Sequence, residues 1–165
     1  YTPLQLAQYV STIANDGVRM QPHLMKEIRD PNHSTDETGE VIEEFEETAL
    51  NTVSMSKEYI ERVQEGFHRV MTGSQGTAAS TFRSASYDPA GKTGTAQVWN
   101  GSGYNYNLTL VGYAPYDNPE VAMSVVVTNV GNGSSVINKN IGKRILDAYF
   151  ADDADQADDA DDTEE

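Results

Sequence analysis

The apolar side chains change their spacing near residue 90, and this change constrains the fold more than any other feature. From there on they recur at every second residue, in three segments rich in β-branched residues: 92–99, 108–114 and 121–130. Short turn-forming sequences join these segments, at 100–103 and 116–119. Since connections this short join neighbouring antiparallel strands, the pattern predicts a three-stranded antiparallel sheet.

Helical spacing dominates the first half of the chain. Thr2 and Gln5 have the spacing of a capping box, so a helix is expected to begin at once and to stop before Gly17. A second amphipathic helix is expected to begin after Ser56 and to end at Gly73. The sheet is therefore preceded by helices.

A further helix is expected after the last strand, with Ser134 or Ser135 at its N-cap. Its predicted buried face consists of residues spaced four apart: Ile137, Ile141, Ile145 and Tyr149. Helices, then an antiparallel sheet, then a covering helix indicate the α+β fold class.

The negative charge of the chain is confined to two short segments. The 165 residues include 26 acidic and 11 basic side chains, which gives a net charge of −15. Residues 36–47 contain seven acids, residues 151–165 contain nine, and neither segment contains a base. We therefore expect a near-neutral domain over residues 1–150 with a solvated acidic loop or hairpin, and a disordered acidic tail over 151–165. Binding to nucleic acid is not expected, because no basic stripe is present.

Missing residue types exclude further classes of function. The chain has no cysteine, which rules out disulfides, thiolate metal sites and a cysteine nucleophile. Its three histidines, His23, His33 and His68, lack the spacing of a zinc site, so neither a metal nor a cofactor is expected. No apolar run in the sequence is long enough to span a membrane.

A polar segment at the start of the first strand carries the main chemical signal: Lys92-Thr93-Gly94-Thr95. Alternation along a strand places Lys92 and Gly94 on one face, and the two threonines on the other. Lys92 supplies a positive charge, the threonine hydroxyls can donate to a carboxylate, and Gly94 lets a ligand approach the backbone. At the edge of a sheet, this segment suits an extended ligand that carries a carboxylate.

Lys92-Thr93-Gly94 resembles the K-T-G motif of penicillin-binding proteins and serine β-lactamases. Other segments resemble class B penicillin-binding proteins, the 2B type above all, in the same order along residues 1–150. The segments that carry this similarity are 1–9 with 13–17, 66–70 with Gly76-Thr77, and 111–116 with 118–120. The resemblance implies the transpeptidase fold of that family and the C-terminal part of its catalytic domain.

The resemblance also implies a function, that of a peptidoglycan D,D-transpeptidase that is acylated by β-lactams. A serine outside this chain is expected to attack the D-Ala-D-Ala bond of a stem peptide. Lys92 is then expected to shape the electric field around that serine and the substrate carboxylate. The Thr93 and Thr95 hydroxyls are expected to bind the carboxylate, Gly94 to permit the approach, and the Thr95 backbone N–H to form half of the oxyanion hole.

The same resemblance implies a cellular setting. Stem peptides and β-lactams are the expected ligands, and the cell elongation or division machinery is the expected partner. The catalytic domain is expected at the extracytoplasmic face of the bacterial membrane, with a membrane anchor that is N-terminal to this chain.

The nucleophile of the family is not recognisable in this chain. The family motifs S-x-x-K and S-x-N should precede residue 1, and no S-x-N occurs here. One S-x-x-K does occur, Ser54–Lys57, but it lies at the expected start of a helix, and we interpret Ser54 as part of a helix cap. The isolated chain is therefore expected to be inactive. Two alternatives stay open: a non-catalytic cell-wall interaction module that retains the fold, and a D,D-carboxypeptidase or β-lactamase.

Overall fold

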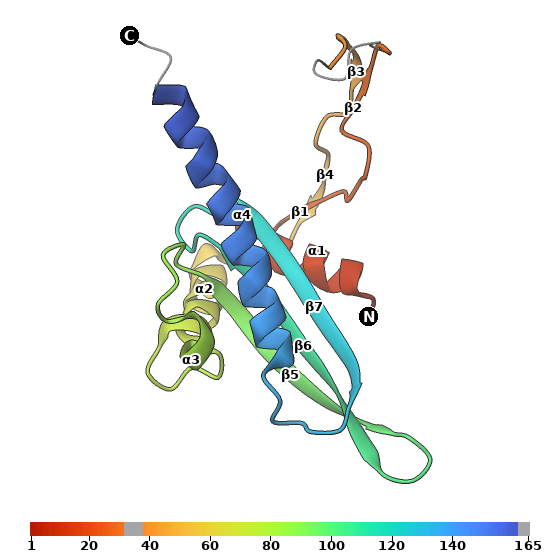
Figure 1. Ribbon diagram of the computed structural model, residues 1–165, viewed down its shortest axis with the longest axis vertical. Helices are drawn as coiled ribbons and strands as arrows, with labels where there is room; N and C mark the ends of the chain where they lie inside the picture. The colour runs from red at the N-terminus through yellow and green to blue at the C-terminus, as the bar shows by residue number, and fades with distance from the viewer. Residues whose placement is uncertain (32–37, 162–165) are drawn as a thin grey trace.

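An antiparallel sheet forms the centre of the protein. The computed structural model describes residues 1–31 and 38–161. The strands of the sheet are adjacent in the order β5 (Ala90–Trp99), β6 (Tyr104–Ala114) and β7 (Val121–Val130) (Figure 1). β5 pairs with β6 residue for residue along its whole length. The predicted three-stranded sheet is confirmed, and so is the α+β class.

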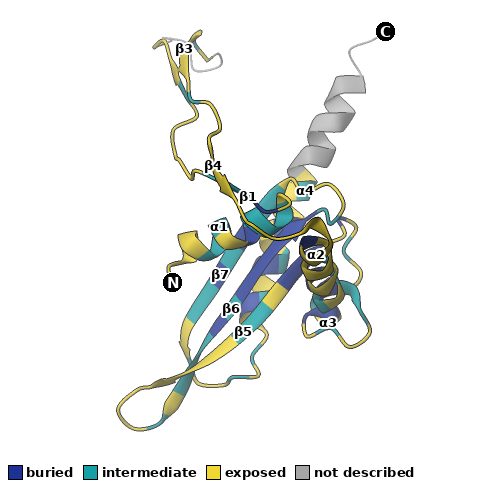
Figure 2. Ribbon diagram, turned by 180° about the vertical axis from the view of Figure 1, so that it is seen from behind, coloured by how far each residue is buried: buried dark blue, intermediate teal, exposed yellow. Residues whose placement is uncertain are grey.

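Helices cover both faces of this sheet. α4 (Ile137–Asp161) and the short α3 (Ala79–Phe82) cover one face, and α1 (Pro3–Ala14) covers the other (Figures 1 and 2). α2 (Lys57–Thr72) lies across the start of β5, where Phe67 packs on the α1 side and Met71 on the α4 side. The upper half of the sheet is therefore enclosed, whereas the β5–β6 hairpin extends beyond the helices (Figure 2).

The N-terminal helices begin and end where the sequence predicts. In the capping box of α1, the Gln5 N–H donates to the Thr2 hydroxyl at 3.2 Å, and the Thr2 N–H donates to the Gln5 side chain at 2.8 Å. α2 begins after Ser56 and ends at Gly73. α3 was not predicted, because four residues are too few to show a helical repeat.

The predicted buried face of α4 is wrong. The four residues expected in the core are exposed, with between 38% and 43% of their surface accessible: Ile137, Ile141, Ile145 and Tyr149. The residues one position further along the helix are buried instead: Asn138, Gly142 and Leu146. The helix is thus rotated relative to the orientation that its isoleucines indicate.

Gly142 provides the physical reason for this rotation. A Cβ atom at Gly142 would collide with Leu110 of β6 and approach Met123 of β7, so the helix comes closest to the sheet along this row. Asn138, one turn earlier, donates from Nδ2 to the Thr109 carbonyl oxygen of β6 at 2.7 Å. Close packing and one hydrogen bond therefore orient α4, and a count of apolar residues cannot reveal either.

α4 also continues beyond residue 150. Its backbone is helical to Asp161, whereas the sequence predicts a disordered tail from residue 151. The segment 151–161 consists of alanine, aspartate and one glutamine, so no glycine or proline interrupts the helix that packing on the sheet has already nucleated. Residues 162–165 lie outside the described part of the chain.

The described residues of segments 18–31 and 38–52 form an acidic arm that projects from the body (Figure 1). Two antiparallel ribbons build the described part of the arm: β1 (Val18–Met20) with β4 (Ala49–Thr52), and β2 (Glu27–Arg29) with β3 (Val41–Glu44). All residues of β3 and β4 are exposed. The prediction of a solvated acidic hairpin is confirmed for the described residues, and Asp36 and Glu37 lie outside them.

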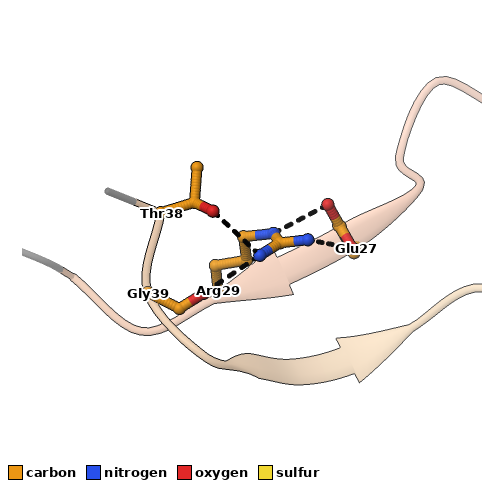
Figure 3. Close-up of polar contacts among 4 residues, drawn as sticks. All are labelled: Glu27, Arg29, Thr38 and Gly39. Atoms are coloured by element: carbon orange, nitrogen blue, oxygen red, sulfur yellow. Dashed lines mark hydrogen bonds and ion pairs between the residues drawn. The ribbon is translucent and has the colours of Figure 1, made fainter. Parts of the chain in front are cut away.

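Arg29 fastens the outer ribbon of the arm (Figure 3). Its guanidinium donates to both carboxylate oxygens of Glu27, at 2.8 and 3.1 Å, and to the Thr38 hydroxyl and the Gly39 carbonyl oxygen, both at 3.1 Å. The hydrogen bond from Arg29 lowers the pKa of Glu27. A single side chain therefore links both sides of a ribbon that has little apolar surface to bury.

Tyr113 on β6 is fully buried between the sheet and α1, and its hydroxyl has no hydrogen-bond partner among the described residues. Substitution Tyr113→Phe removes this desolvated hydroxyl without changing the packed ring. We expect the free energy of unfolding at pH 7 to stay the same or to rise by about 1 kcal/mol. Urea denaturation of the two proteins at pH 7 measures the difference.

The same pair of proteins gives a pH-dependent result. Burial, with smaller contributions from Tyr116 and Asp16, raises the pKa of Tyr113. Above a pH of about 10 the unfolded chain loses this proton and the folded protein keeps it, so the wild type loses stability as the pH rises. The stability advantage of Tyr113→Phe should therefore grow between pH 9 and 11. A phenylalanine variant that is less stable at every pH would contradict the structure.

Candidate active site

β5 is an edge strand, and its first half carries Lys92–Thr95. In the described part of the chain β5 pairs only with β6, so its other edge is free. An edge strand leaves backbone N–H and C=O groups unpaired, and an extended ligand can bind to them. Lys92 lies opposite Val111 on the α1 side, and Thr93 lies opposite Leu110 on the α4 side. The segment therefore has the alternation that the sequence predicts.

The Lys92 side chain is exposed at this edge. Its Nζ donates to the Thr93 carbonyl oxygen at 2.6 Å. The ion pairs found among the side chains of residues 1–31 and 38–151 do not include Lys92. Its positive charge is thus available to an anionic ligand on the free side of β5.

The Thr93 hydroxyl is in contact with a second threonine from another part of the chain. Thr77 lies in the loop between α2 and α3, and its Oγ1 is 2.7 Å from Thr93 Oγ1. Lys139 of α4 donates from Nζ to the Thr77 carbonyl oxygen at 3.1 Å. Sequence reasoning recognised Gly76-Thr77 as a family segment but gave it no role, and it missed Lys139, whose position depends on the orientation of α4.

Gly94 is closely approached by a side chain of the neighbouring strand. A Cβ atom at this position would collide with Oγ1 of Thr109, its cross-strand neighbour on β6. The sequence-based expectation is that Gly94 lets a ligand approach the backbone. The structure adds a contact that exists without a ligand, since the Thr109 side chain lies over the backbone of Gly94.

Trp99 and Tyr104 face each other at the tip of the β5–β6 hairpin. Their rings pack edge to face with centroids 5.3 Å apart, and each residue is 60% exposed. The Asn100 side chain accepts hydrogen bonds from the N–H groups of Ser102 and Gly103 and so orders the turn. The pair is therefore an exposed turn feature and not part of the core.

His68 has a structural environment. Its Nε2 lies 2.8 Å from the Asp88 carboxylate, and its ring stacks on Tyr116 with centroids 4.3 Å apart. These contacts join α2 to the segment before β5 and to the turn after β6. His68 therefore has partners that hold the fold together, and no serine is among those in the described part of the chain.

Ser54 and Lys57 are both exposed at the start of α2. Lys57 is 79% exposed at its side chain and lies 3.6 Å from Glu61, one helical turn further along. Neither residue contacts β5 through a hydrogen bond or ion pair among the described residues. This position agrees with a helix start and gives no support to a catalytic role for Ser54.

Other features of the described residues lie away from Lys92–Thr95. A hollow of about 600 Å³ lies between α1, the base of the arm and residues 117–122, and no residue of β5 lines it. No group of three or more His, Asp or Glu side chains in residues 1–31 and 38–151 has the arrangement of a metal site. None of the described helices is both long and apolar enough to cross a lipid bilayer.

Comparison with known proteins identifies the family of this fold and site. The family model described as "Penicillin binding protein transpeptidase domain" matches residues 1–147, and the chain belongs to this family. Within it, the relatives of the chain are class B penicillin-binding proteins. The resemblance that the motifs indicate is therefore confirmed.

Individual relatives and structures are similar over most of the chain. Penicillin-binding protein 2A of Bacillus subtilis is 51% identical in an alignment 160 residues long that covers 91% of this chain and 22% of that protein. Penicillin-binding protein 2B of Streptococcus pneumoniae is 36% identical and covers 90% of this chain and 22% of its own length. The structure of the 2B protein from strain R6 superimposes with a TM-score of 0.80 at 35% identity, over 90% of this chain and 24% of that one. The chain thus spans less than a quarter of the length of these proteins.

Proposed function

We propose that this chain provides one wall of the active site of a peptidoglycan D,D-transpeptidase. The observation that carries the proposal is the position of Lys92, Thr93 and Thr95 on a free strand edge in a chain of this family. The relative named peptidoglycan D,D-transpeptidase MrdA of Haemophilus influenzae supports the activity. It is 33% identical in an alignment 164 residues long that covers 90% of this chain and 23% of that protein.

The proposed reaction needs a serine from a part of the protein outside this chain. Its hydroxyl attacks the carbonyl carbon between the last two D-Ala residues, the terminal D-Ala leaves as an amine, and a serine ester forms. An amine of a neighbouring stem peptide then attacks the ester. This step forms the cross-linking amide and releases the serine.

The β5 residues stabilise the negative charges of the substrate and of the transition state in this reaction. The Thr93 and Thr95 hydroxyls donate to the carboxylate of the terminal D-Ala, and the Lys92 ammonium stabilises negative charge on the carboxylate and near the serine. The Thr95 N–H donates to the oxyanion that forms on the attacked carbonyl. β-Lactams carry a similarly placed carboxylate and acylate the same serine.

Because the substrate is cell-wall peptidoglycan, we place the domain at the extracytoplasmic face of the membrane, beside the elongation or division machinery.

Covalent labelling with a fluorescent penicillin tests this function. A longer protein that contains this chain together with an upstream S-x-x-K serine should be labelled, and the 165-residue chain alone should not. Supplied with a stem peptide and an amine acceptor, the longer protein should form the cross-linked product in excess of the hydrolysed one. Absence of labelling in the longer protein, or labelling of Ser54 in the short one, would contradict the proposal.

A further inference from the structure

Thr77 is held rigidly although it lies in a loop. The Gly76 N–H donates to the Gly73 carbonyl oxygen at 2.9 Å, and the Ala78 N–H donates to the Val70 carbonyl oxygen at 3.0 Å, so both neighbours of Thr77 are fixed to the end of α2. A Cβ atom at Gly76 would collide with backbone carbonyl oxygens of α2, so the loop packs directly on the helix. Ala78 is fully buried. The Thr77 hydroxyl is thus presented to Thr93 from a fixed backbone.

α4 supports this loop from the other side. Lys139 is partly buried, and its Nζ donates to the Thr77 carbonyl oxygen at 3.1 Å. The neighbouring Asn138 is hydrogen-bonded to β6 and Gly142 packs on the sheet, so the backbone that carries Lys139 cannot shift freely. Contacts therefore run from α4 through Lys139 and Thr77 to Thr93 on β5.

The chemistry of the ligand determines the direction of the hydrogen bond between the two threonines. A carboxylate can only accept hydrogen bonds, so Thr93 must donate its single hydroxyl proton to a bound carboxylate. The Thr93 oxygen is then free to accept, and the Thr77 hydroxyl, 2.7 Å away, is the donor in reach. A hydroxyl that accepts one hydrogen bond donates a second one more strongly, because each bond polarises the next.

We propose that Thr77 is a positioning residue for the carboxylate site: its hydroxyl donates to Thr93 and directs the Thr93 proton to the ligand, and Lys139 holds Thr77 in place. The inference rests on the proposed function, since it needs a carboxylate ligand at Thr93. It adds two residues outside Lys92–Thr95 to the recognition of that ligand. Neither contacts the ligand in this arrangement, and both act through Thr93.

Penicillin acylation of the longer protein that contains this chain tests the role of Thr77. Thr77→Val keeps the shape of the side chain and removes the donor, and Thr77→Ser keeps the donor. We expect Thr77→Val to lower the second-order rate constant for acylation by benzylpenicillin about 10-fold, mainly through weaker binding before acylation, because the lost bond supports a charged contact. Thr77→Ser should retain most of the wild-type rate. Ser74→Ala, which removes an exposed hydroxyl from the same loop, is the matched control.

Acylation by a ligand without the carboxylate charge distinguishes a positioning role of Thr77 from a general structural effect of its substitution. Toward the methyl ester of benzylpenicillin, Thr77→Val and wild type should acylate at similar rates, because no carboxylate is there to receive the Thr93 proton. The double variant Thr77→Val, Thr93→Val should be no slower toward benzylpenicillin than Thr93→Val alone. Lys139→Met should reproduce part of the Thr77→Val effect, with the same preference for the charged ligand.

The possible outcomes distinguish the two proposals. A wild-type protein that no penicillin labels would overturn the proposed function and the carboxylate site with it. A labelled wild type whose Thr77→Val variant slows equally toward acid and ester would overturn only the positioning role. Melting temperatures of all variants identify any that fail to fold. If Thr77→Val fails to fold, the acylation rates of Thr77→Ser and Lys139→Met toward the acid and the ester test the positioning role instead.

Discussion

Substitution Lys92→Met in the longer protein should lower the second-order rate constant for penicillin acylation about 100- to 1000-fold, the effect typical of removing one electrostatic contact to a transition state. The loss is expected because Lys92 is exposed at the free edge of β5 and takes part in no ion pair among the described residues. Its charge is therefore not engaged in holding the fold. Stopped-flow or gel-based labelling at several penicillin concentrations measures the rate constant.

Lys57→Met is the matched control for this experiment. It makes the same change, from a charged side chain to an uncharged one of similar length, in the exposed S-x-x-K segment, and the labelling rate should stay at the wild-type value. Lys92→Arg should recover part of the rate only, because a planar guanidinium does not reproduce a compact ammonium charge. If Lys57→Met abolished labelling and Lys92→Met did not, the assignment of Ser54–Lys57 to a helix start would be wrong.

Phe82→Ala is expected to be the most destabilising single truncation in the core described here, by about 3–5 kcal/mol. Phe82 is fully buried, and it is the large apolar side chain by which the four-residue α3 joins the core cluster that also contains Met71 and Leu110. A loss of this size is comparable with the whole stability of many domains. Guanidinium denaturation of the purified variant measures it.

An exposed aromatic residue provides the control for Phe82. Tyr59 on α2 is 59% exposed, and Tyr59→Ala should change the free energy of unfolding by less than about 0.5 kcal/mol. Phe82→Leu refills most of the space and should recover part of the loss. Equal losses for Phe82→Ala and Tyr59→Ala would show that α3 does not pack as the structure has it.

The parts of the fold that could be predicted are those that depend on local sequence patterns. The three strands follow from two-residue spacing with short turns between them, and the ends of α1 and α2 follow from Gln5, Ser56 and Gly73, residues whose effect depends on the chain next to them. The family resemblance likewise rests on contiguous motifs such as Lys92-Thr93-Gly94. These features need no knowledge of distant contacts.

The wrong and missed predictions concern features that depend on contacts between residues far apart in the sequence. The isoleucines of α4 favour one face, but the close approach at Gly142 turns another face to the sheet, and only the tertiary structure shows that approach. The contact of Thr77 with Thr93 joins residues 16 positions apart, and that of Lys139 with Thr77 joins residues 62 positions apart. Sequence spacing therefore located the candidate site on β5 but not the residues that support it.

The packing of Thr109 over Gly94 has a consequence for how this segment can evolve. Because the Thr109 hydroxyl occupies the space of a Cβ atom at position 94, an alanine at 94 requires the Thr109 side chain to turn to another rotamer or to be replaced by a smaller residue. The two positions are thus coupled, since a smaller residue at 109 leaves room for a side chain at 94. A substitution on β6 can therefore change which residues the neighbouring K-T-G strand accepts.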